Sequence, residues 1–335
     1  MPALERESNR IVIAGASSLF GAELKSLLEE SRFAGWDFRL VDEEVVAGTL
    51  TEAGGEPAVI QPVEEGSFEK ARLVLFTGSP EFTRRNWKAA SGSGAVVIDL
   101  SGEIAGEAKT MAWFPKLDVL LKREFKKDAA AYAIPSAAAT AAATLALALS
   151  KNELRRLAVV LFQPVSEAGR PGIEELESQT GQLLSFQGVG RPVFDTQVAF
   201  NMVDRFGPAS ALKLGAIRER VRVETRASLG KKVAMPAIQI VHAPVFYGTA
   251  FSAWAEVELG AEAAKIARAC SDAGFMLPAE GDGGLSNVGA TGEKSIVLAK
   301  PEADPSQPGG WWFWGAADNI RLPAANAVKL AEMLA

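Results

Sequence analysis

The sequence contains almost no cysteine and almost no histidine: one residue of each type in a chain of 335. A single cysteine excludes a disulfide within the chain and a metal site built from several cysteines, and it fits a reducing compartment. Histidine is the usual general acid or base near neutral pH, so a mechanism of that kind has only one candidate residue. Few side chains are therefore available for cysteine-dependent or histidine-dependent catalysis.

An excess of positive charge and a leucine-rich apolar run are also missing. The net charge is −6 and the isoelectric point is about 5.2, which gives no indication of a nucleic-acid partner or of an anionic membrane surface. The N-terminal segment MPALERESNR is polar and has no apolar signal-peptide core, so we expect a cytoplasmic protein. The uncharged residues 129–150 contain a proline and mostly alanine, and we expect a buried helix there rather than a membrane span.

The first part of the chain alternates short apolar runs with helical patterns, and this alternation predicts an α/β fold with a parallel sheet covered on both faces. Hydrophobic residues make up 48% of the chain and charged residues 23%, which suits a globular protein of two domains. The predicted strands are residues 10–14, 38–41, 58–63, 73–76 and 96–100, and the predicted helices are 21–31 and 81–90.

The second part of the chain has a different pattern. Residues 238–258 alternate in a way that predicts a half-buried antiparallel sheet. Further strands are predicted at 157–163, 295–300 and 311–316, helices at 171–186, 209–228, 260–274 and 322–335, and a loop at 301–310.

Residues 15–21 (GASSLFG) follow the first strand and open the first helix. Glycines at both ends of such a turn allow a tight bend, and the helix N-terminus offers free N–H groups to a pyrophosphate. Ser18 replaces the middle glycine of the usual pattern. The segment predicts dinucleotide binding, with a purely structural turn as the alternative. The expected nucleotide contacts in this loop are Gly15, Ser17, Ser18, Leu19, Phe20 and Gly21.

Three acidic residues, Asp42, Glu43 and Glu44, follow the second strand. A carboxylate at this place normally accepts hydrogen bonds from the adenosine ribose and disfavours a 2′-phosphate. The sequence therefore favours NAD over NADP, with Asp42 as a cofactor residue. A solvated acidic loop that binds no cofactor remains the alternative.

Five segments together resemble the aspartate-semialdehyde dehydrogenase family, and USG-1-like sequences most of all. They are GASSLFGAEL (15–24), VVIDLSG (96–102), FQPVSEAGRPGIEELESQT (162–180), HAPVFYGTA (242–250) and ADNIRLPAANAVKLAEML (317–334). The resemblance implies a Rossmann-type domain, residues 1–135 with 318–335, and a substrate and dimerisation domain, residues 136–317. It also implies a homodimer.

The family uses a cysteine thiolate that attacks an aldehyde, a hydride transfer to NADP and release of the acyl group by phosphate, in the biosynthesis of lysine, threonine and methionine. In this chain Ala137 falls at the cysteine position, and a methyl group cannot form a thioester. The family's histidine, the general acid and base, corresponds to Thr249, which does not titrate near neutral pH. The resemblance therefore implies a scaffold without its reactive groups.

Other positions of the resemblance are also altered. His242 stands where the family has an arginine for the substrate carboxylate, and it is either a packing residue of a strand or a remaining ligand for an anionic group. Residues 100–105 offer no counterpart to a second arginine. Glu43 and Val45 replace the serine and arginine that bind a 2′-phosphate, and Glu167 adds a carboxylate near the expected nicotinamide. Retained positions are Gln163 near the substrate and Asn326 on the cofactor side, and Thr77 and Gly78 are further expected cofactor contacts.

Three remaining features have ordinary structural explanations. Ser136 lies beside the vacant nucleophile position, but Thr249 cannot serve as its base. Cys270 lies in a predicted helix and is expected to be an unreactive buried thiol. The tryptophans at 311, 312 and 314 are expected in core or dimer packing rather than in cofactor stacking.

The leading hypothesis is a dimeric relative of aspartate-semialdehyde dehydrogenase that has lost thioester chemistry. It would bind NAD, NADP or no nucleotide, or act as a regulatory partner of another protein. The rival hypothesis is an NAD(P)-dependent oxidoreductase that transfers hydride directly, with Gln163 and Thr249 polarising a carbonyl group. A third hypothesis is a structural protein in which Ser18 and Glu167 fill the cofactor groove.

Overall fold

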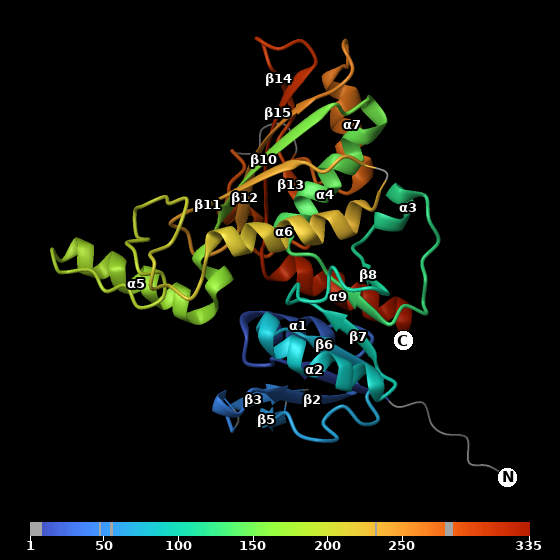
Figure 1. Ribbon diagram of the computed structural model, residues 1–335, viewed down its shortest axis with the longest axis vertical. Helices are drawn as coiled ribbons and strands as arrows, with labels where there is room; N and C mark the ends of the chain where they lie inside the picture. The colour runs from blue at the N-terminus through green and yellow to red at the C-terminus, as the bar shows by residue number, and fades with distance from the viewer. Residues whose placement is uncertain (1–8, 47, 54–55, 232, 279–283) are drawn as a thin grey trace. The chain divides into compact units, whose positions relative to one another are not determined.

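The computed structural model describes residues 9–46, 48–53, 56–231, 233–278 and 284–335. The chain folds into two compact units (Figure 1). The first unit comprises Met1–Phe114, Glu124–Ile134 and Pro323–Ala335, and the second comprises Pro115–Arg123 and Pro135–Leu322. None of the helices within the described ranges is long and apolar enough to cross a membrane.

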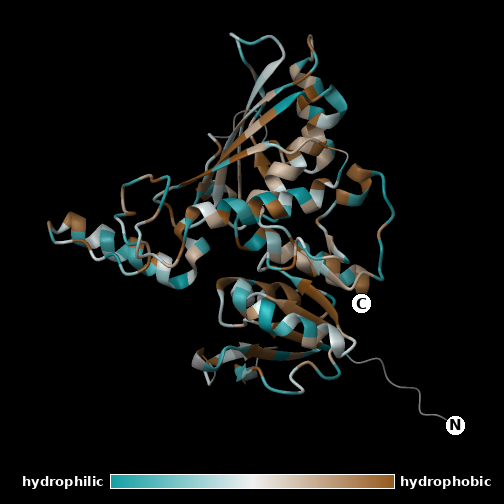
Figure 2. Ribbon diagram, viewed as in Figure 1, coloured by the Kyte–Doolittle hydropathy of each residue, from teal (hydrophilic) through white to brown (hydrophobic). Residues whose placement is uncertain are grey.

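The first unit contains a seven-stranded sheet in the order β5-β2-β1-β6-β7-β9-β8, and every pair in it is parallel. Its strands are β1 (Arg10–Ala14), β2 (Asp37–Asp42), β5 (Gln61–Pro62), β6 (Leu73–Phe76), β7 (Val96–Asp99), β8 (Thr110–Ala112) and β9 (Ala131–Ala133). The central strands are apolar and buried on both faces, so they are brown in Figure 2. The predicted parallel sheet is therefore confirmed.

Helices cover both faces of this sheet. On one face Ile11 and Ile13 pack in a core that includes α1 (Leu19–Glu29) and α9 (Arg321–Leu334). On the other face Val12 packs in a core that includes Phe82 of α2 (Pro80–Gly92). The residues predicted as one strand at 58–63 divide between β5 and a hairpin of β3 (Leu50–Ala53) and β4 (Glu56–Val59).

The second unit contains a mixed sheet in the order β11-β10-β12-β15-β13, with β14 also paired to β15. Its strands are β10 (Arg156–Gln163), β11 (Ala237–His242), β12 (Thr249–Glu256), β13 (Val297–Leu298), β14 (Glu302–Ala303) and β15 (Gly310–Ala317). The antiparallel prediction for residues 238–258 is wrong in part, because β11 runs parallel to β10 and only β12 is antiparallel to it. The connection explains the difference: Val245 and Phe246 accept hydrogen bonds from Val165 and Ser166, so the chain passes around the end of β10.

Helices α4 (Ala137–Leu149), α6 (Leu214–Leu229) and α7 (Ala263–Ala273) lie together over one side of this sheet (Figure 1). The buried helix predicted within residues 129–150 is confirmed as α4, but it is shorter than the segment, which begins with strand β9. Pro135 has no N–H to continue a helix, and Ser136 caps α4 by accepting a hydrogen bond from Ala139. Every residue of α4 is buried.

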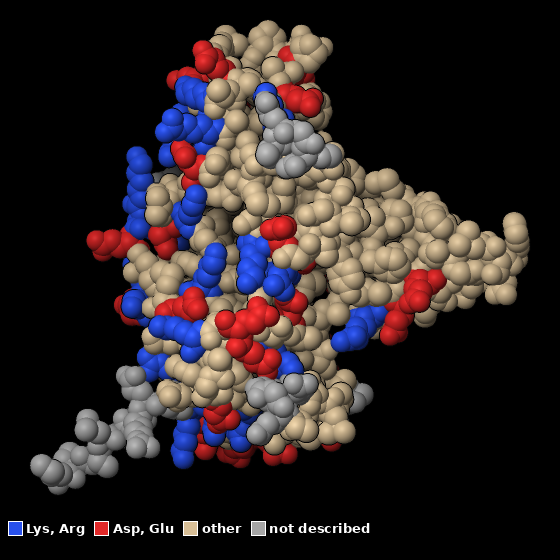
Figure 3. Space-filling view, turned by 180° about the vertical axis from the view of Figure 1, so that it is seen from behind, with Lys and Arg blue, Asp and Glu red and all other residues tan. Residues whose placement is uncertain are grey.

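The other described helices of the second unit are α3 (Leu117–Leu121), α5 (Gly169–Leu184) and α8 (Asn287–Ala290). The opposite face of the mixed sheet is apolar and partly open to solvent. Opposed residues in antiparallel strands share a face, and the pairs Ala158–Trp254, Val160–Ser252 and Trp254–Trp312 place these side chains together. Figure 3 shows a wide area of this unit without charged side chains.

Candidate functional site

The two central strands of the first unit, β1 and β6, form the point at which the strand order reverses. From β1 the chain goes to β2 on one side and then to β6 on the other. Ligands of open α/β sheets bind outside the carboxyl ends of such strands. Gly15 follows β1 with φ +93°, and a Cβ atom placed on it would lie 2.1 Å from the amide nitrogen of Gly78, which follows β6. Glycine is therefore required where these two loops meet.

Ser18 fixes the loop that connects β1 and α1. Its hydroxyl accepts a hydrogen bond from the Gly21 amide (2.9 Å) and donates one to the Thr77 carbonyl (2.8 Å). The first amides of a helix have no acceptor within the helix, so Leu19 and Phe20 present their N–H groups at the positive end of α1. The loop keeps these two donors for an anionic group, while Ser18 occupies the third donor, that of Gly21.

Asp42 is buried and holds the same loop from the end of β2. Its Oδ2 atom accepts hydrogen bonds from the amide (2.8 Å) and the hydroxyl (2.7 Å) of Ser17, and its Oδ1 atom accepts one from the Glu43 amide (2.8 Å). With these three hydrogen bonds the Asp42 carboxylate positions the loop between β1 and α1. Little of its capacity to accept hydrogen bonds remains for a ribose hydroxyl. Sequence patterns gave no sign of this contact with Ser17.

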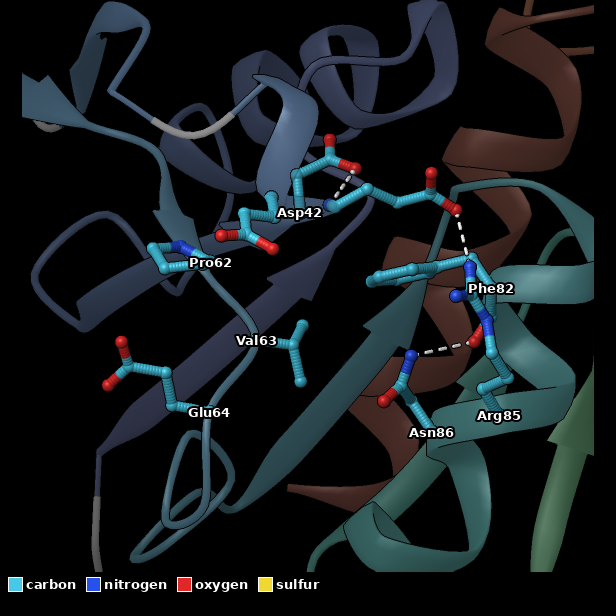
Figure 4. A pocket seen from close by; sticks show the side chains of 9 residues that line it. Asp42, Pro62, Val63, Glu64, Phe82, Arg85 and Asn86 are labelled. Atoms are coloured by element: carbon cyan, nitrogen blue, oxygen red, sulfur yellow. Dashed lines mark hydrogen bonds and ion pairs between the residues drawn. The ribbon is translucent and has the colours of Figure 1, made fainter.

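A hollow of about 730 Å³ opens beside Asp42 (Figure 4). Phe82 and Arg85 come from α2 on one side, and Pro62 and Val63 lie on the other. The nine lining residues are Asp42, Glu43, Glu44, Pro62, Val63, Glu64, Phe82, Arg85 and Asn86. This is the end of β2, where the adenosine of a dinucleotide lies in Rossmann-type folds.

Asn326 lies in α9 of the first unit and is 2% exposed. Its Nδ2 atom makes no hydrogen bond within the protein, although buried donors are normally paired. Three features of the first unit suit a dinucleotide. They are the unpaired Asn326 donor, the two free amides at the start of α1, and the loop that requires Gly15. The residues of the first unit therefore fit this cofactor.

In the second unit, Ala137 is the first residue of α4 and only 1% exposed, so a methyl group stands at the helix N-terminus. The preceding Ser136 donates hydrogen bonds from its amide (3.0 Å) and its hydroxyl (2.5 Å) to one oxygen of Glu224. The role of Glu224 could not be predicted from the sequence, because a single glutamate within a charged helix gives no sign of its distant partner. Ser136 thus has a carboxylate beside it, although Thr249 cannot serve as its base.

Arg220 links two buried carboxylates. Its guanidinium lies 3.8 Å from Glu224 and 3.5 Å from Glu167. Burial raises the pKa of both carboxyl groups, and the charge of Arg220 offsets only part of that effect. The single positive charge of Arg220 therefore lies beside two acidic side chains. Glu167 and Glu224 bind protons more readily than exposed glutamates do.

The network continues from Glu167 to Gly248, the residue before β12. Asn319 donates hydrogen bonds to Glu167 (3.3 Å) and Ser166 (3.0 Å), and it accepts one from the Gly248 amide (2.9 Å). The structure thus joins residues 136, 166, 167, 220, 224, 248 and 319 in one polar cluster of the second unit. The side-chain amide of Gln163 also bonds to Glu167 and lowers its pKa.

Gln163 and Thr249 are both buried, at 3% and 2% exposure. The Oε1 atom of Gln163 and the hydroxyl of Thr249 make no hydrogen bond within the protein. A ligand with a hydroxyl or carbonyl group would satisfy such atoms.

His242 is fully buried in the second unit between the rings of Phe194 and Phe206, whose centroids lie 5.7 and 5.6 Å from its own. Burial lowers the pKa of the imidazole to about 4, and a weak contact with the Val198 backbone offsets only part of this. The histidine is therefore neutral at physiological pH and cannot replace an arginine as a carboxylate ligand.

Cys270 lies buried in α7, and burial raises the pKa of its thiol to about 12. A thiol with such a pKa is not a nucleophile at neutral pH, which agrees with the unreactive buried thiol expected from the sequence. Trp311 is buried, whereas Trp312 and Trp314 are 47% and 39% exposed on the open face of the mixed sheet.

Two family models match the chain in succession. Residues 10–145 match the semialdehyde dehydrogenase NAD binding domain, and residues 145–322 match the semialdehyde dehydrogenase dimerisation domain. A USG-1 protein homolog of Pseudomonas aeruginosa is 28% identical over 330 residues, and aspartate-semialdehyde dehydrogenase 2 of Vibrio cholerae is 26% identical over 331 residues. Each alignment covers 97% of both chains.

Solved structures agree with these matches. A probable aspartate-semialdehyde dehydrogenase from Pseudomonas aeruginosa superimposes with a TM-score of 0.84 at 27% identity, over 97% of this chain and 98% of the other. Aspartate semialdehyde dehydrogenase II from Vibrio cholerae gives the same TM-score at 25% identity, over the same shares. With its cofactor-type loop in the first unit and its polar cluster in the second, the chain belongs to the semialdehyde dehydrogenase family.

Proposed function

We propose that the protein is a dimeric semialdehyde dehydrogenase homologue that binds a nicotinamide dinucleotide but has lost the thioester step. The observation that carries this proposal is the methyl group of Ala137 at the N-terminus of α4, where a nucleophile would have to stand. Nicotinamide, when bound, would accept or donate a hydride. The residues that would hold the dinucleotide are Gly15, Leu19, Phe20, Gly78 and Asn326.

Other candidate groups do not replace the missing thiolate. The Cys270 thiol is buried in α7 with a pKa of about 12, and Thr249 has no group that titrates near neutral pH. The His242 imidazole is neutral and fully buried. Loss of a covalent nucleophile or its base typically lowers the rate by several orders of magnitude.

The test is oxidation of aspartate semialdehyde by the pure protein in phosphate buffer, followed as reduced nicotinamide with NAD or NADP. We expect no turnover under conditions in which aspartate-semialdehyde dehydrogenase 2 of Vibrio cholerae, as a positive control, is active. Turnover that disappears in Ser136→Ala would overturn the proposal, because Ser136 and Glu224 would then form a substitute nucleophile and base.

A second candidate function is direct hydride transfer to or from a small oxo compound. Two unpaired groups favour it, the Gln163 Oε1 atom and the Thr249 hydroxyl. Both are buried polar groups that would gain a hydrogen-bond partner from a bound substrate. Oxidation of NADH in the presence of a panel of short aldehydes and keto acids would detect this activity. It should fall in Thr249→Val, which keeps the shape of the side chain and removes the hydroxyl. An equal rate in that variant would count against this role.

NAD is the dinucleotide that we propose. Four of the nine residues lining the hollow beside β2 are acidic, and they would repel the 2′-phosphate of NADP. We also propose that two copies of the chain associate through the open apolar face of the mixed sheet, within the segment that matches the family's dimerisation domain.

A further inference from the structure

Arg85 is the only basic residue among the nine that line the hollow beside β2. Its guanidinium bonds to the carboxylate of Glu43 at 2.8 Å. The two side chains come from different elements, Glu43 from the loop after β2 and Arg85 from α2, and both line the hollow, where Figure 4 labels Arg85. Both are substantially exposed, at 41% for Glu43 and 58% for Arg85, so a ligand can reach them without opening the core.

We propose that the Glu43–Arg85 pair decides whether the site takes NAD or NADP. Arg85 can bind a 2′-phosphate, and Glu43 opposes this by neutralising the guanidinium charge and by accepting a hydrogen bond from its Nη2 atom. This inference rests on the proposed binding of a nicotinamide dinucleotide and names the residues that set its specificity.

The chemistry of the two dinucleotides supports this assignment. NAD presents a 2′-hydroxyl, which can donate a hydrogen bond to a carboxylate such as that of Glu43. NADP presents a phosphate, which a guanidinium binds in a bidentate way but which a carboxylate repels. While Glu43 holds Arg85, a phosphate would have to displace a charge-assisted hydrogen bond and meet Glu44 and Glu64 nearby.

Removing the charge of Glu43 should therefore release Arg85. Asp42 cannot take over the role of Glu43, because both of its oxygens already accept hydrogen bonds from Ser17 and Glu43 amides. In Glu43→Gln the guanidinium stays within the same hollow and is free to bind phosphate. The gain for NADPH should be about tenfold or more, as expected for charge-assisted hydrogen bonds.

The experiment is a titration of NADH and NADPH, read as binding by calorimetry, with four proteins: wild type, Glu43→Gln, Glu43→Gln with Arg85→Ala, and Glu44→Gln. Wild type should prefer NADH. Glu43→Gln should bind NADPH about tenfold more tightly than wild type, and adding Arg85→Ala should abolish that gain. Glu44→Gln removes the same charge from the hollow without touching the ion pair, and it should change NADPH binding much less.

The outcomes separate the two proposals. If wild type binds neither nucleotide, the proposed cofactor function fails and the specificity pair fails with it. If wild type binds NADH but the gain in Glu43→Gln survives Arg85→Ala, or Glu44→Gln gives the same gain, only the role of Arg85 is overturned. Thermal unfolding of each variant verifies that these exposed substitutions leave the protein folded.

Discussion

The pKa of His242 is about 4 because the imidazole is buried between two phenylalanine rings in the second unit. In the unfolded chain the same group has a pKa of about 6.5. Below pH 6.5 the unfolded state therefore binds a proton that the folded state refuses until the pH approaches 4. The contribution of His242 to stability is complete above pH 6.5 and is lost as the pH falls through this window.

We expect the free energy of unfolding of the wild type to lose about 2–3 kcal/mol from this group between pH 7 and pH 4.5. The raised pKa values of Glu167 and Glu224 act in the opposite direction, since those carboxyl groups bind protons more readily in the folded state. The measurement is urea unfolding across this pH range for wild type and His242→Leu, which share both carboxylates. A difference between the two proteins that does not change with pH would contradict the assignment.

The place of a residue in a helix or strand can be predicted from the sequence more readily than the partner of its hydrogen bonds. Aligned motifs place Ala137 at the family's cysteine position, and the structure has this residue as the first of α4. The same motifs gave no sign that Ser136 bonds to Glu224, because the two are 88 residues apart and nothing in a helix of mixed charge marks one glutamate as buried. The buried state of His242 was one of two open alternatives for the same reason.

At the scale of elements, the loop between β1 and α1 shows why glycine is needed at one position. Gly15 has φ +93°, which side chains rarely adopt, and a Cβ atom there would meet the backbone of Gly78. Gly15→Ala should therefore lower the free energy of unfolding by about 2 kcal/mol or more and abolish NADH binding.

The matched control for this change is Gly92→Ala at the end of α2. A Cβ atom on Gly92 has no heavy atom within 4 Å, and the residue is exposed within a helix. This substitution should raise the free energy of unfolding by about 0.4–1 kcal/mol. Denaturant unfolding and calorimetric titration with NADH measure both variants. Normal NADH binding by Gly15→Ala would show that the loop is not the phosphate site.

Elements with a strong local pattern were predicted well, and those set by distant contacts were not. The strands β1, β6 and β7 are apolar runs that only a buried parallel strand explains, and the structure has them within one residue of the prediction. By contrast, the direction of β11 depends on hydrogen bonds between residues 165–166 and 245–246 beyond the end of β10. The short β9 is apolar like α4, and only residues 134–136, which include Pro135, separate the two.

At the scale of the whole molecule, the open apolar face of the mixed sheet is the surface that we expect to bind a partner. The indole N–H groups of Trp254 and Trp312 both donate to Asp304, at 3.1 and 3.0 Å. Trp314 donates to the Leu285 carbonyl at 2.9 Å. With their polar atoms already satisfied, these side chains present only apolar ring surface, and fixed aromatic rings are typical of strong contact points in protein interfaces.

We therefore expect the wild type to sediment at twice the chain mass of 35.4 kDa and Trp312→Glu to sediment as a monomer. A carboxylate at this position would be buried without a partner on association, which costs more than an interface of ordinary size can supply. The control is Leu50→Glu, which places the same charge at a 76% exposed position of the β3–β4 hairpin in the first unit. That variant should remain a dimer. If Trp312→Glu is still dimeric at micromolar concentration, the two copies associate through another surface, and the apolar face of the sheet has to be assigned to a different partner.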